Sequence, residues 1–289
     1  MTQRWYEEYL VCPDCTRPLR LTAACACGFT VPEGLPLDLR PQKPRRVQLD
    51  FPIGSSPASG LEDCLVERPR VTYRGPRAER DSTELVSAAE PWLRPGAKLL
   101  DLGCGPRDQA VVAAHYGVQY VGLDYSSKRA DLLADAHTTP FADATFDVVL
   151  SYAVLEHLYN PFAALHELAR ILKPGGVFVG TVSQGEPFHD SYFHHTAFGV
   201  MSVFTAAGLR PLRLWPSYDT LHALSTMGRY PRIQRLMIEA VYRIGRRVPI
   251  LAPRKYFRWT PREKAVDELH RAASICFLAE KTVERPVAI

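Results

Sequence analysis

The sequence lacks any apolar run that approaches the roughly 20 residues of a membrane-spanning helix. It also lacks an apolar leader, because Glu7 and Glu8 stand where a signal peptide would be apolar. Neither sign of charge predominates, since the sequence has 35 Lys and Arg residues and 31 Asp and Glu residues, for a net charge of only +4. That excess is too small to indicate a nucleic-acid-binding protein. We therefore expect a cytoplasmic protein without a transmembrane segment.

Internal repeats are absent as well. Hydrophobic residues make up 46% of the 289 residues and charged residues 23%, which excludes a disordered chain, a collagen and a coiled coil. The presence of 24 prolines beside only 18 glycines indicates long structured connections. At roughly 100–200 residues per domain, the length fits one large domain with a small appendage.

Cysteine is scarce except near the start of the chain. Four of the seven cysteines lie within the first thirty residues, namely Cys12, Cys15, Cys25 and Cys27. In a reducing compartment, two close cysteine pairs indicate a Zn²⁺ site more than disulfides or free thiols. Four protein ligands would leave the ion no open coordination position, so we predict a structural zinc and not a catalytic one.

The stretch that follows the second cysteine pair, residues 31–39, completes a resemblance. About the first forty residues resemble the small zinc-ribbon proteins that activate tRNA methyltransferases, and we assign residues 1–40 to such a module. Residues 41–81 are rich in Pro and Arg and are expected to form a connector packed on the next domain. Residues 82–289 are expected to form that domain.

Helical and strand patterns alternate from residue 82 onward. Short apolar strands are predicted at 98–102, 120–123, 146–151, 177–182, 210–214 and 274–281. Helices are predicted at 83–92, 109–116, 127–133, 161–172 and 196–207. This alternation predicts a doubly wound α/β fold with a parallel sheet covered by helices on both faces. Residues 216–273 are too many for an ordinary connection and are predicted to form a helical cap inserted before the last strand.

The first of these strands carries Asp101 near its end and runs into a glycine-rich turn at Gly103, Cys104 and Gly105. Glycines let a ligand approach the backbone, but Asp108 stands at the third glycine position of a dinucleotide-binding turn, so NAD is disfavoured. The turn resembles the first motif of the class I S-adenosylmethionine (SAM)-dependent methyltransferases, an acidic residue followed by a glycine-rich turn. The resemblance implies that these four residues contact SAM.

Four further landmarks of that family follow in the family's order. Asp124, Tyr125 and Ser126 match the second motif, whose acidic side chain accepts hydrogen bonds from the ribose hydroxyls of SAM. Asp135 and Ala136 match the segment that holds the adenine amine. The strand ending at Ser151 and the Leu172-Lys-Pro-Gly-Gly176 turn complete a match over about residues 95–215. The resemblance implies a seven-stranded, Rossmann-like sheet that binds SAM and releases S-adenosylhomocysteine.

Methyl transfer is an in-line displacement, so a base is needed only to take the proton of an acceptor hydroxyl or amine. His157 follows the strand at 146–151, at the ligand-binding edge of the sheet. Tyr192, His194 and His195 follow the strand at 177–182 and should overhang the pocket. We predict His194 or His195 as the base, with His157 as a further candidate. The alternative for each histidine is a role in ordering its loop, and a metal held by Asp190, His194 and His195 is disfavoured.

Basic residues crowd the predicted cap. Between residues 229 and 262, one acid, Glu239, faces Arg229, Arg232, Arg235, Arg243, Arg246, Arg247, Arg254, Lys255, Arg258 and Arg262. Apolar residues recur there at helical spacing, at Ile233, Leu236, Met237, Val241 and Ile244. One interpretation is a helix packed on the domain with a solvated charged face. The others are a surface for a phosphate-bearing substrate, for a membrane interface or for RNA.

The sequence therefore predicts a SAM-dependent methyltransferase that acts on an oxygen or nitrogen of a small-molecule or lipid-like metabolite. One alternative is an rRNA or tRNA methyltransferase that binds RNA through the zinc ribbon and the cap. Two nucleic-acid chemistries are disfavoured, because Ser151-Tyr-Ala-Val154 lacks the Pro-Pro-aromatic run of base-amine enzymes and neither Cys104 nor Cys276 is placed as a nucleophile. Another alternative is a non-catalytic scaffold or activator. This fold hosts many substrates, so the acceptor and the oligomeric state stay open.

Overall fold

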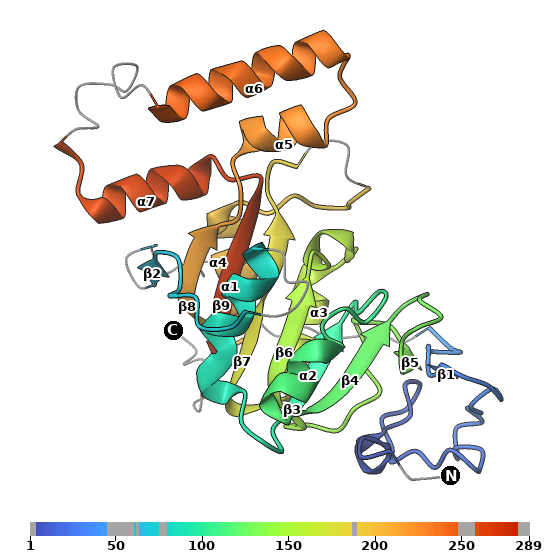
Figure 1. Ribbon diagram of the computed structural model, residues 1–289. Coiled ribbons are helices and arrows are strands. Elements are labelled where there is room, and N and C mark those ends of the chain that lie inside the picture. The colour runs from blue at the N-terminus through green and yellow to red at the C-terminus, as the bar shows by residue number, and fades with distance from the viewer. Residues whose placement is uncertain are drawn as a thin grey trace.

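The computed structural model describes residues 4–44, 61, 64–74, 80–186, 190–247 and 258–282 (Figure 1). One sheet runs through it in the order β1-β5-β4-β3-β6-β7-β9-β8-β2. Its strands are β1 (Leu37–Asp38), β2 (Leu65–Val66), β3 (Lys98–Leu102), β4 (Gln119–Asp124), β5 (Leu132–Leu133), β6 (Phe146–Tyr152), β7 (Leu172–Ser183), β8 (Leu209–Pro216) and β9 (Ser274–Lys281). None of the described helices is both long and apolar enough to cross a membrane.

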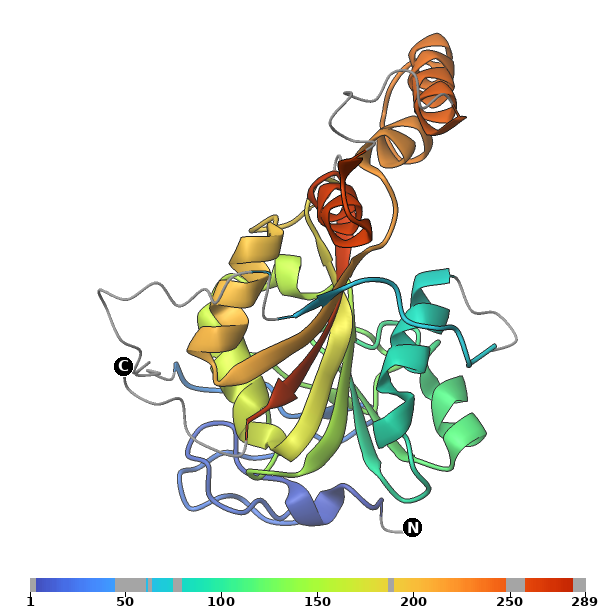
Figure 2. The same ribbon diagram turned by 90° about the vertical axis from the view of Figure 1, so that its left-hand side faces the viewer.

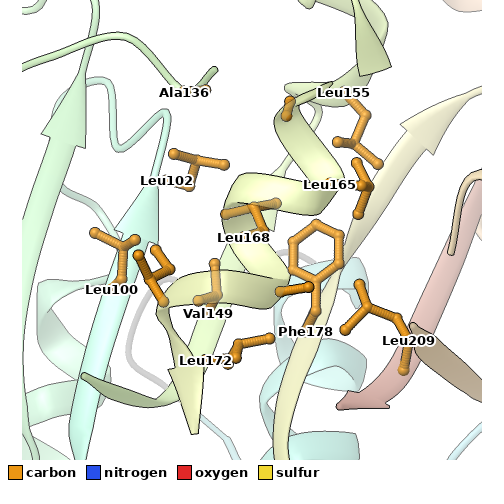
Figure 3. Packing of buried hydrophobic residues seen from close by; sticks show 14 of the residues in the cluster. Leu100, Leu102, Ala136, Val149, Leu155, Leu165, Leu168, Leu172, Phe178 and Leu209 are labelled. Carbon is orange, nitrogen blue, oxygen red and sulfur yellow. The ribbon is translucent and has the colours of Figure 1, made fainter. Parts of the chain in front are cut away.

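The two faces of the sheet bury alternate residues of the same strands, as a side-chain period of two requires. On one face, Leu99 and Val148 pack with helices α1 (Arg80–Ala89) and α2 (Ala110–Tyr116). On the other face, Leu100, Val149 and Phe178 pack with α3 (Pro161–Ile171) and α4 (Ala197–Ala206) (Figures 2 and 3). The predicted doubly wound α/β fold is thus confirmed.

The last strand departs from the predicted parallel sheet. Strand β9 lies between β7 and β8 and is antiparallel to both of them. The chain leaves the carboxyl end of β8 into the cap and enters β9 from that same end, so β9 must run in the opposite direction.

The helix predicted at 127–133 is wrong. A turn and strand β5 occupy these residues, and β5 pairs in parallel with β4. The N-terminal segment fills the space beside β5: β1 pairs with it as an edge strand, and Leu39 and Phe29 are buried in the same cluster as Leu132. Leu10 adds an antiparallel bridge to Phe141. The apolar residues of 127–133 are therefore covered by a distant segment and need no helix.

The opposite edge of the sheet is extended by β2, which pairs in parallel with β8. Within the described residues the sheet has nine strands and not seven, because two short segments from before residue 80 pair with its two edges. Nearby, the Arg68 guanidinium donates to Glu84 Oε2 at 2.8 Å, and Tyr73 is buried in the cluster of α1 and α2. The remainder of the predicted connector, residues 45–60, 62–63 and 75–79, lies outside the described residues.

Three helices form the cap between β8 and β9: α5 (Thr220–Thr226), α6 (Arg232–Arg247) and α7 (Pro261–His270). They project beyond one end of the sheet (Figures 1 and 2). Because β8 runs in the same direction as β7 and β6, the cap begins at the edge where the carboxyl ends of these strands meet. Arg254 and Lys255 of the basic stretch lie outside the described residues.

Candidate functional site

The glycine-rich turn lies at the carboxyl end of β3. Gly103 and Gly105 have φ angles of 68° and 47°, in the left-handed region that favours glycine. A Cβ atom on Gly103 would lie 2.3 Å from Val154 Cγ2, so the turn packs closely against the segment after β6. A Cβ atom on Gly105 would meet nothing within 4 Å. The backbone at Gly105 therefore borders open space that a ligand can enter.

Two predicted cofactor residues of this turn are buried. Asp101 accepts a hydrogen bond of 2.7 Å from the Tyr120 hydroxyl. Burial raises the pKa of the Asp101 carboxyl to about 7, although the Tyr120 hydrogen bond lowers it. Cys104 is buried against Gly122, and burial raises the pKa of its thiol to about 12. The structure thus gives both side chains internal contacts beneath the open backbone.

Asp124 connects the turn to the loop after β4. Its Oδ2 atom accepts from the Gly105 N–H at 3.0 Å, and its Oδ1 atom accepts from the N–H groups of Ser126 and Ser127, both at 2.8 Å. Three backbone amides therefore hold the carboxylate in place. Carboxylate oxygens have about four lone-pair sites, so Oδ2 can still accept from a ligand hydroxyl.

Asp135 is paired with a residue that the sequence reasoning missed. The His137 ring Nδ1 lies 2.6 Å from Asp135 Oδ1, and the His137 Nε2 atom accepts from the Asn160 N–H at 3.3 Å. Burial alone would raise the pKa of Asp135, but the hydrogen bonds from the His137 side chain and backbone lower it overall. Both of these bonds use Oδ1, which leaves Oδ2 to accept from a ligand.

Ser151 and Ala136, the other predicted cofactor residues, are both buried. Ser151 Oγ has no hydrogen-bond partner among the described residues. Tyr125, by contrast, is exposed and lies with its ring centre 5.6 Å from the Arg40 guanidinium. Together with Pro32, Asp38, Arg40, Pro41 and Gln42, it lines a hollow of about 310 Å³. The N-terminal segment therefore reaches the edge of the candidate cofactor site.

The predicted catalytic residues are brought to the same sheet edge, but their environments differ. His195 is buried, and its N–H donates to Ser183 O at the end of β7 at 2.8 Å. Its Nδ1 atom has no hydrogen-bond partner among the described residues, and burial lowers the pKa of its imidazole. Tyr192, His194 and His157 are exposed. Among these predicted bases, His195 is thus enclosed, whereas His194 and His157 are exposed.

Two buried carboxyl groups lie beneath this segment, and the sequence reasoning assigned them no role. Glu156 is buried, and its backbone oxygen accepts from the Tyr192 N–H at 2.8 Å. Burial, together with the charge of Glu186, raises the pKa of Glu156 to about 7. Glu186 accepts from Ser183 Oγ at 2.9 Å and from the Tyr218 hydroxyl. In the sequence, the one signal for these two carboxyl groups is that Glu156 directly precedes the candidate base His157.

A row of aromatic rings extends from His137, the partner of Asp135, to Tyr192. The ring centres of His137 and Tyr159 are 4.1 Å apart in a stacked arrangement, and those of Tyr159 and Tyr192 are 6.4 Å apart. Tyr159, Tyr192 and the neighbouring Phe193 are exposed. Tyr159 and Tyr192 meet edge to face at 74°, so the row offers exposed apolar ring faces and edges next to the candidate cofactor residues.

The four N-terminal cysteines form one cluster, with all four sulfur atoms within 4.8 Å of one another. Cys12 Sγ lies 3.5 Å from Cys27 Sγ, and Cys15 Sγ lies 3.5 Å from Cys25 Sγ. A tetrahedral zinc with Zn–S bonds of about 2.3 Å separates its sulfurs by about 3.8 Å, so the cluster fits a zinc ion. Gly28, at a φ of 93°, closes the turn of the second pair. Backbone bonds tie the segment to the sheet, from Val11 N–H to Pro140 O and from Ala142 N–H to Tyr9 O.

Comparisons with known proteins identify the central part of the chain. Residues 100–180 match the family model of a methyltransferase domain. A ubiquinone biosynthesis O-methyltransferase of Parvibaculum lavamentivorans is 28% identical over 141 residues, 48% of this chain and 51% of that protein. A 27-O-demethylrifamycin SV methyltransferase of Amycolatopsis mediterranei is 34% identical over 102 residues, 29% of this chain and 38% of that protein.

The chain spans about half or less of the length of these curated relatives. Among solved structures, a sarcosine dimethylglycine methyltransferase of Galdieria sulphuraria is 18% identical with a TM-score of 0.47, over 68% of this chain and 82% of that one. The match over residues 100–180 coincides with the glycine-rich turn, Asp124, Asp135 and Ser151. Residues 100–180 of the chain therefore match a methyltransferase domain.

Proposed function

We propose that this chain transfers a methyl group from SAM to an oxygen or nitrogen of a small-molecule or lipid-like acceptor. The proposal rests on one observation: two features of the structure lie at the same edge of the sheet. One is the open turn of Gly105 and Asp124 after β3 and β4, and the other is the buried His195 beside the end of β7. A ligand at this edge lies where open α/β sheets commonly bind their ligands.

The residues at this edge fit SAM, which when bound supplies an electrophilic methyl group on its sulfonium. The backbone at Gly105 borders open space, and Asp124 Oδ2 would accept hydrogen bonds from the ribose hydroxyls. Asp135 Oδ2 would accept from the adenine amine, since His137 holds the other oxygen of that carboxylate. The buried Asp101 would support the turn from below.

His195 is proposed to take the proton of the acceptor. Its imidazole is buried and its pKa is lowered, so the ring is neutral near pH 7. Its Nδ1 atom, which has no hydrogen-bond partner among the described residues, can then accept a proton. The exposed His194 and His157 lack this enclosure, and we assign them to the rim of the site. Tyr192 is placed there too, with its ring open to an acceptor.

The acceptor is proposed to be flat and largely apolar. The exposed rings of Tyr159, Tyr192 and Phe193 offer such a molecule a stacking surface. The relatives named for ubiquinone biosynthesis and for rifamycin accord with this class of acceptor.

The N-terminal module is proposed to hold a structural zinc through Cys12, Cys15, Cys25 and Cys27. Residues 1–40 would then form a zinc ribbon, residues 41–81 a connector, and residues 82–289 the methyltransferase domain. The contacts of Leu10, Phe29 and Leu39 with the sheet support a stabilising role for the ion. Four thiolates would occupy its whole coordination shell, so the zinc takes no part in methyl transfer.

The experiment is a transfer assay with methyl-labelled SAM and a cell extract separated into small-molecule, lipid, RNA and protein fractions. The proposal predicts label in the small-molecule or lipid fraction with the wild-type chain and a large loss of label with Asp124→Ala. Label in the RNA fraction would favour the rRNA or tRNA methyltransferase alternative. SAM binding without label in any fraction would favour a non-catalytic scaffold.

A further inference from the structure

Helix α6 of the cap is attached to the molecule by its polar side. Glu239 accepts a hydrogen bond of 2.8 Å from Ser225 Oγ of α5, and its carboxylate lies 3.7 Å from His222 Nδ1. The ring of Tyr242 lies on the same side, with its centre 5.3 Å from that of His222. These contacts fix which side of α6 faces α5.

The apolar side of α6 consequently faces outward, contrary to the interpretation of a packed helix with only a solvated charged face. The exposed fractions are 73% for Ile233, 61% for Leu236, 64% for Met237, 60% for Val241 and 51% for Ile244. Their spacing of three and four residues places them along one face. No other described part of the chain covers this face, which is unusual for large aliphatic side chains in a row.

Arginines accompany this apolar face: at helical spacing Arg232 and Arg243 lie next to it, and Arg235 lies on the opposite side of the helix. Arg229, Arg232, Arg235 and Arg243 are exposed, and the sequence of α6 ends with Arg246 and Arg247. The single acid, Glu239, is engaged by Arg243 Nε at 2.6 Å and by Ser225. These charges are almost all of one sign, and anionic lipid headgroups would neutralise them while the arginine stems lie along the acyl boundary.

We propose that α6 binds the surface of a bilayer that contains anionic phospholipids. The helix would lie in the plane of the interface, with Ile233, Leu236, Met237, Val241 and Ile244 inserted and the arginines at the phosphates. Its 16 residues extend for about 24 Å, enough for a continuous contact with the bilayer. The charge complementarity of the arginines and the anionic headgroups selects this occupant.

The position of α6 connects this surface with the candidate acceptor site. The cap begins directly after β8, at the edge that carries the ends of β6 and β7. Tyr218, just before α5, donates to the buried Glu186 beneath the His195 segment. A bilayer bound at α6 would therefore lie on the same end of the molecule as the candidate acceptor site.

The test is flotation of the full chain with phosphatidylcholine vesicles, with and without phosphatidylglycerol. The wild-type chain should float with the phosphatidylglycerol vesicles, and added salt should weaken this binding. Val241→Asp should weaken it about tenfold or more, because the charge falls in the inserted face. The double variant Arg229→Gln with Arg232→Gln, two exposed arginines at or just before the start of α6, should weaken it by about fivefold per arginine.

Val71→Asp is the matched control, since Val71 lies outside the cap and is 42% exposed. This variant should float as the wild-type chain does, and an unchanged melting temperature should show that each variant is folded. The proposal is overturned if the wild-type chain does not float, or if Val241→Asp floats equally well. It is also overturned if the wild-type chain is a dimer that Val241→Asp dissociates, or if α6 retains RNA and not vesicles.

Flotation needs neither SAM nor an acceptor, so this inference does not depend on the proposed function. Failure of the methyl-transfer assay leaves flotation as predicted. Failure of flotation leaves methyl transfer as predicted.

Discussion

Gly105 and Asp124 are joined by a hydrogen bond of 3.0 Å in which the Gly105 N–H donates to Asp124 Oδ2. The bond links the turn after β3 to the end of β4, and the N–H groups of Ser126 and Ser127 hold the other carboxylate oxygen. A single acidic side chain therefore shapes the open turn and presents an oxygen to it. This arrangement makes Asp124 the residue on which the cofactor assignment depends most.

Asp124→Ala is predicted to weaken SAM binding by about tenfold to a hundredfold, because hydrogen bonds to a charged group contribute about 1.5–3 kcal/mol. Isothermal titration calorimetry measures this change. Asp108→Ala removes an exposed acid from the same loop and serves as the control, for which affinity should change little. Equal affinities of wild-type and Asp124→Ala proteins would argue against the site.

His195→Gln is predicted to lower kcat by about 10²–10⁴-fold, since a positioned base contributes that much. SAM affinity should be nearly unchanged, because His195 is proposed to face the acceptor. His194→Gln is the matched control, since His194 is the exposed neighbour and should retain most of the activity. A larger loss in His194→Gln than in His195→Gln would reverse the assignment of the base.

The pH profile gives an independent reading of His195. A base works when unprotonated, and burial lowers the pKa of His195 below the ordinary histidine value of 6.5. The wild-type kcat/KM should therefore stay constant as the pH falls through the ordinary histidine pKa of 6.5, and it should decline only at lower pH. This acid limb should disappear in His195→Gln. An acid limb that starts above the ordinary histidine value would contradict a buried neutral imidazole.

Leu39→Ala is predicted to lower the free energy of unfolding by about 2–5 kcal/mol, because Leu39 is fully buried between the N-terminal segment and the sheet. Leu35→Ala, four residues earlier, should change it by less than about 0.5 kcal/mol because Leu35 is exposed. Denaturant unfolding measures both values. Similar small effects of both substitutions would mean that the segment does not pack on the sheet.

The central strands and the glycine-rich turn could be predicted from the sequence because their signals are local. Strand β3 carries Leu99, Leu100 and Leu102 with Asp101 near its end, and Gly103 follows directly. The prediction of a helix at 127–133 was wrong because these residues form a turn and a strand that pairs with β1, a segment about a hundred residues earlier in the chain. No local pattern could reveal that pairing.

The same reasoning applies to the site. Asp124 and Asp135 stand in sequence motifs, whereas the pairing of Asp135 with His137 and the burial of Glu156 arise from tertiary packing. Helix α6 shows the limit of periodicity most clearly. Its spacing predicted an apolar face, but tertiary contacts such as that of Glu239 with Ser225 determine that this face points away from the domain.

Cys27→Ser is predicted to lower the bound zinc below one ion per chain and to lower the melting temperature, because a structural zinc contributes directly to folding. Metal analysis and thermal unfolding measure the two effects. Cys276→Ala is the control, since Cys276 is buried in β9, away from the cluster. This control should lose some stability and keep its zinc. Absence of zinc from the wild-type chain would contradict the zinc ribbon.

The most direct measurement is transfer of labelled methyl from SAM by the purified, zinc-loaded wild-type chain, compared with His195→Gln at equal concentration. The account predicts label in a small-molecule or lipid acceptor with the wild-type chain, release of S-adenosylhomocysteine in equal amount, and a loss of about a hundredfold or more in His195→Gln. It would be contradicted by a folded wild-type chain that binds SAM but transfers no label, or by label that appears only in RNA.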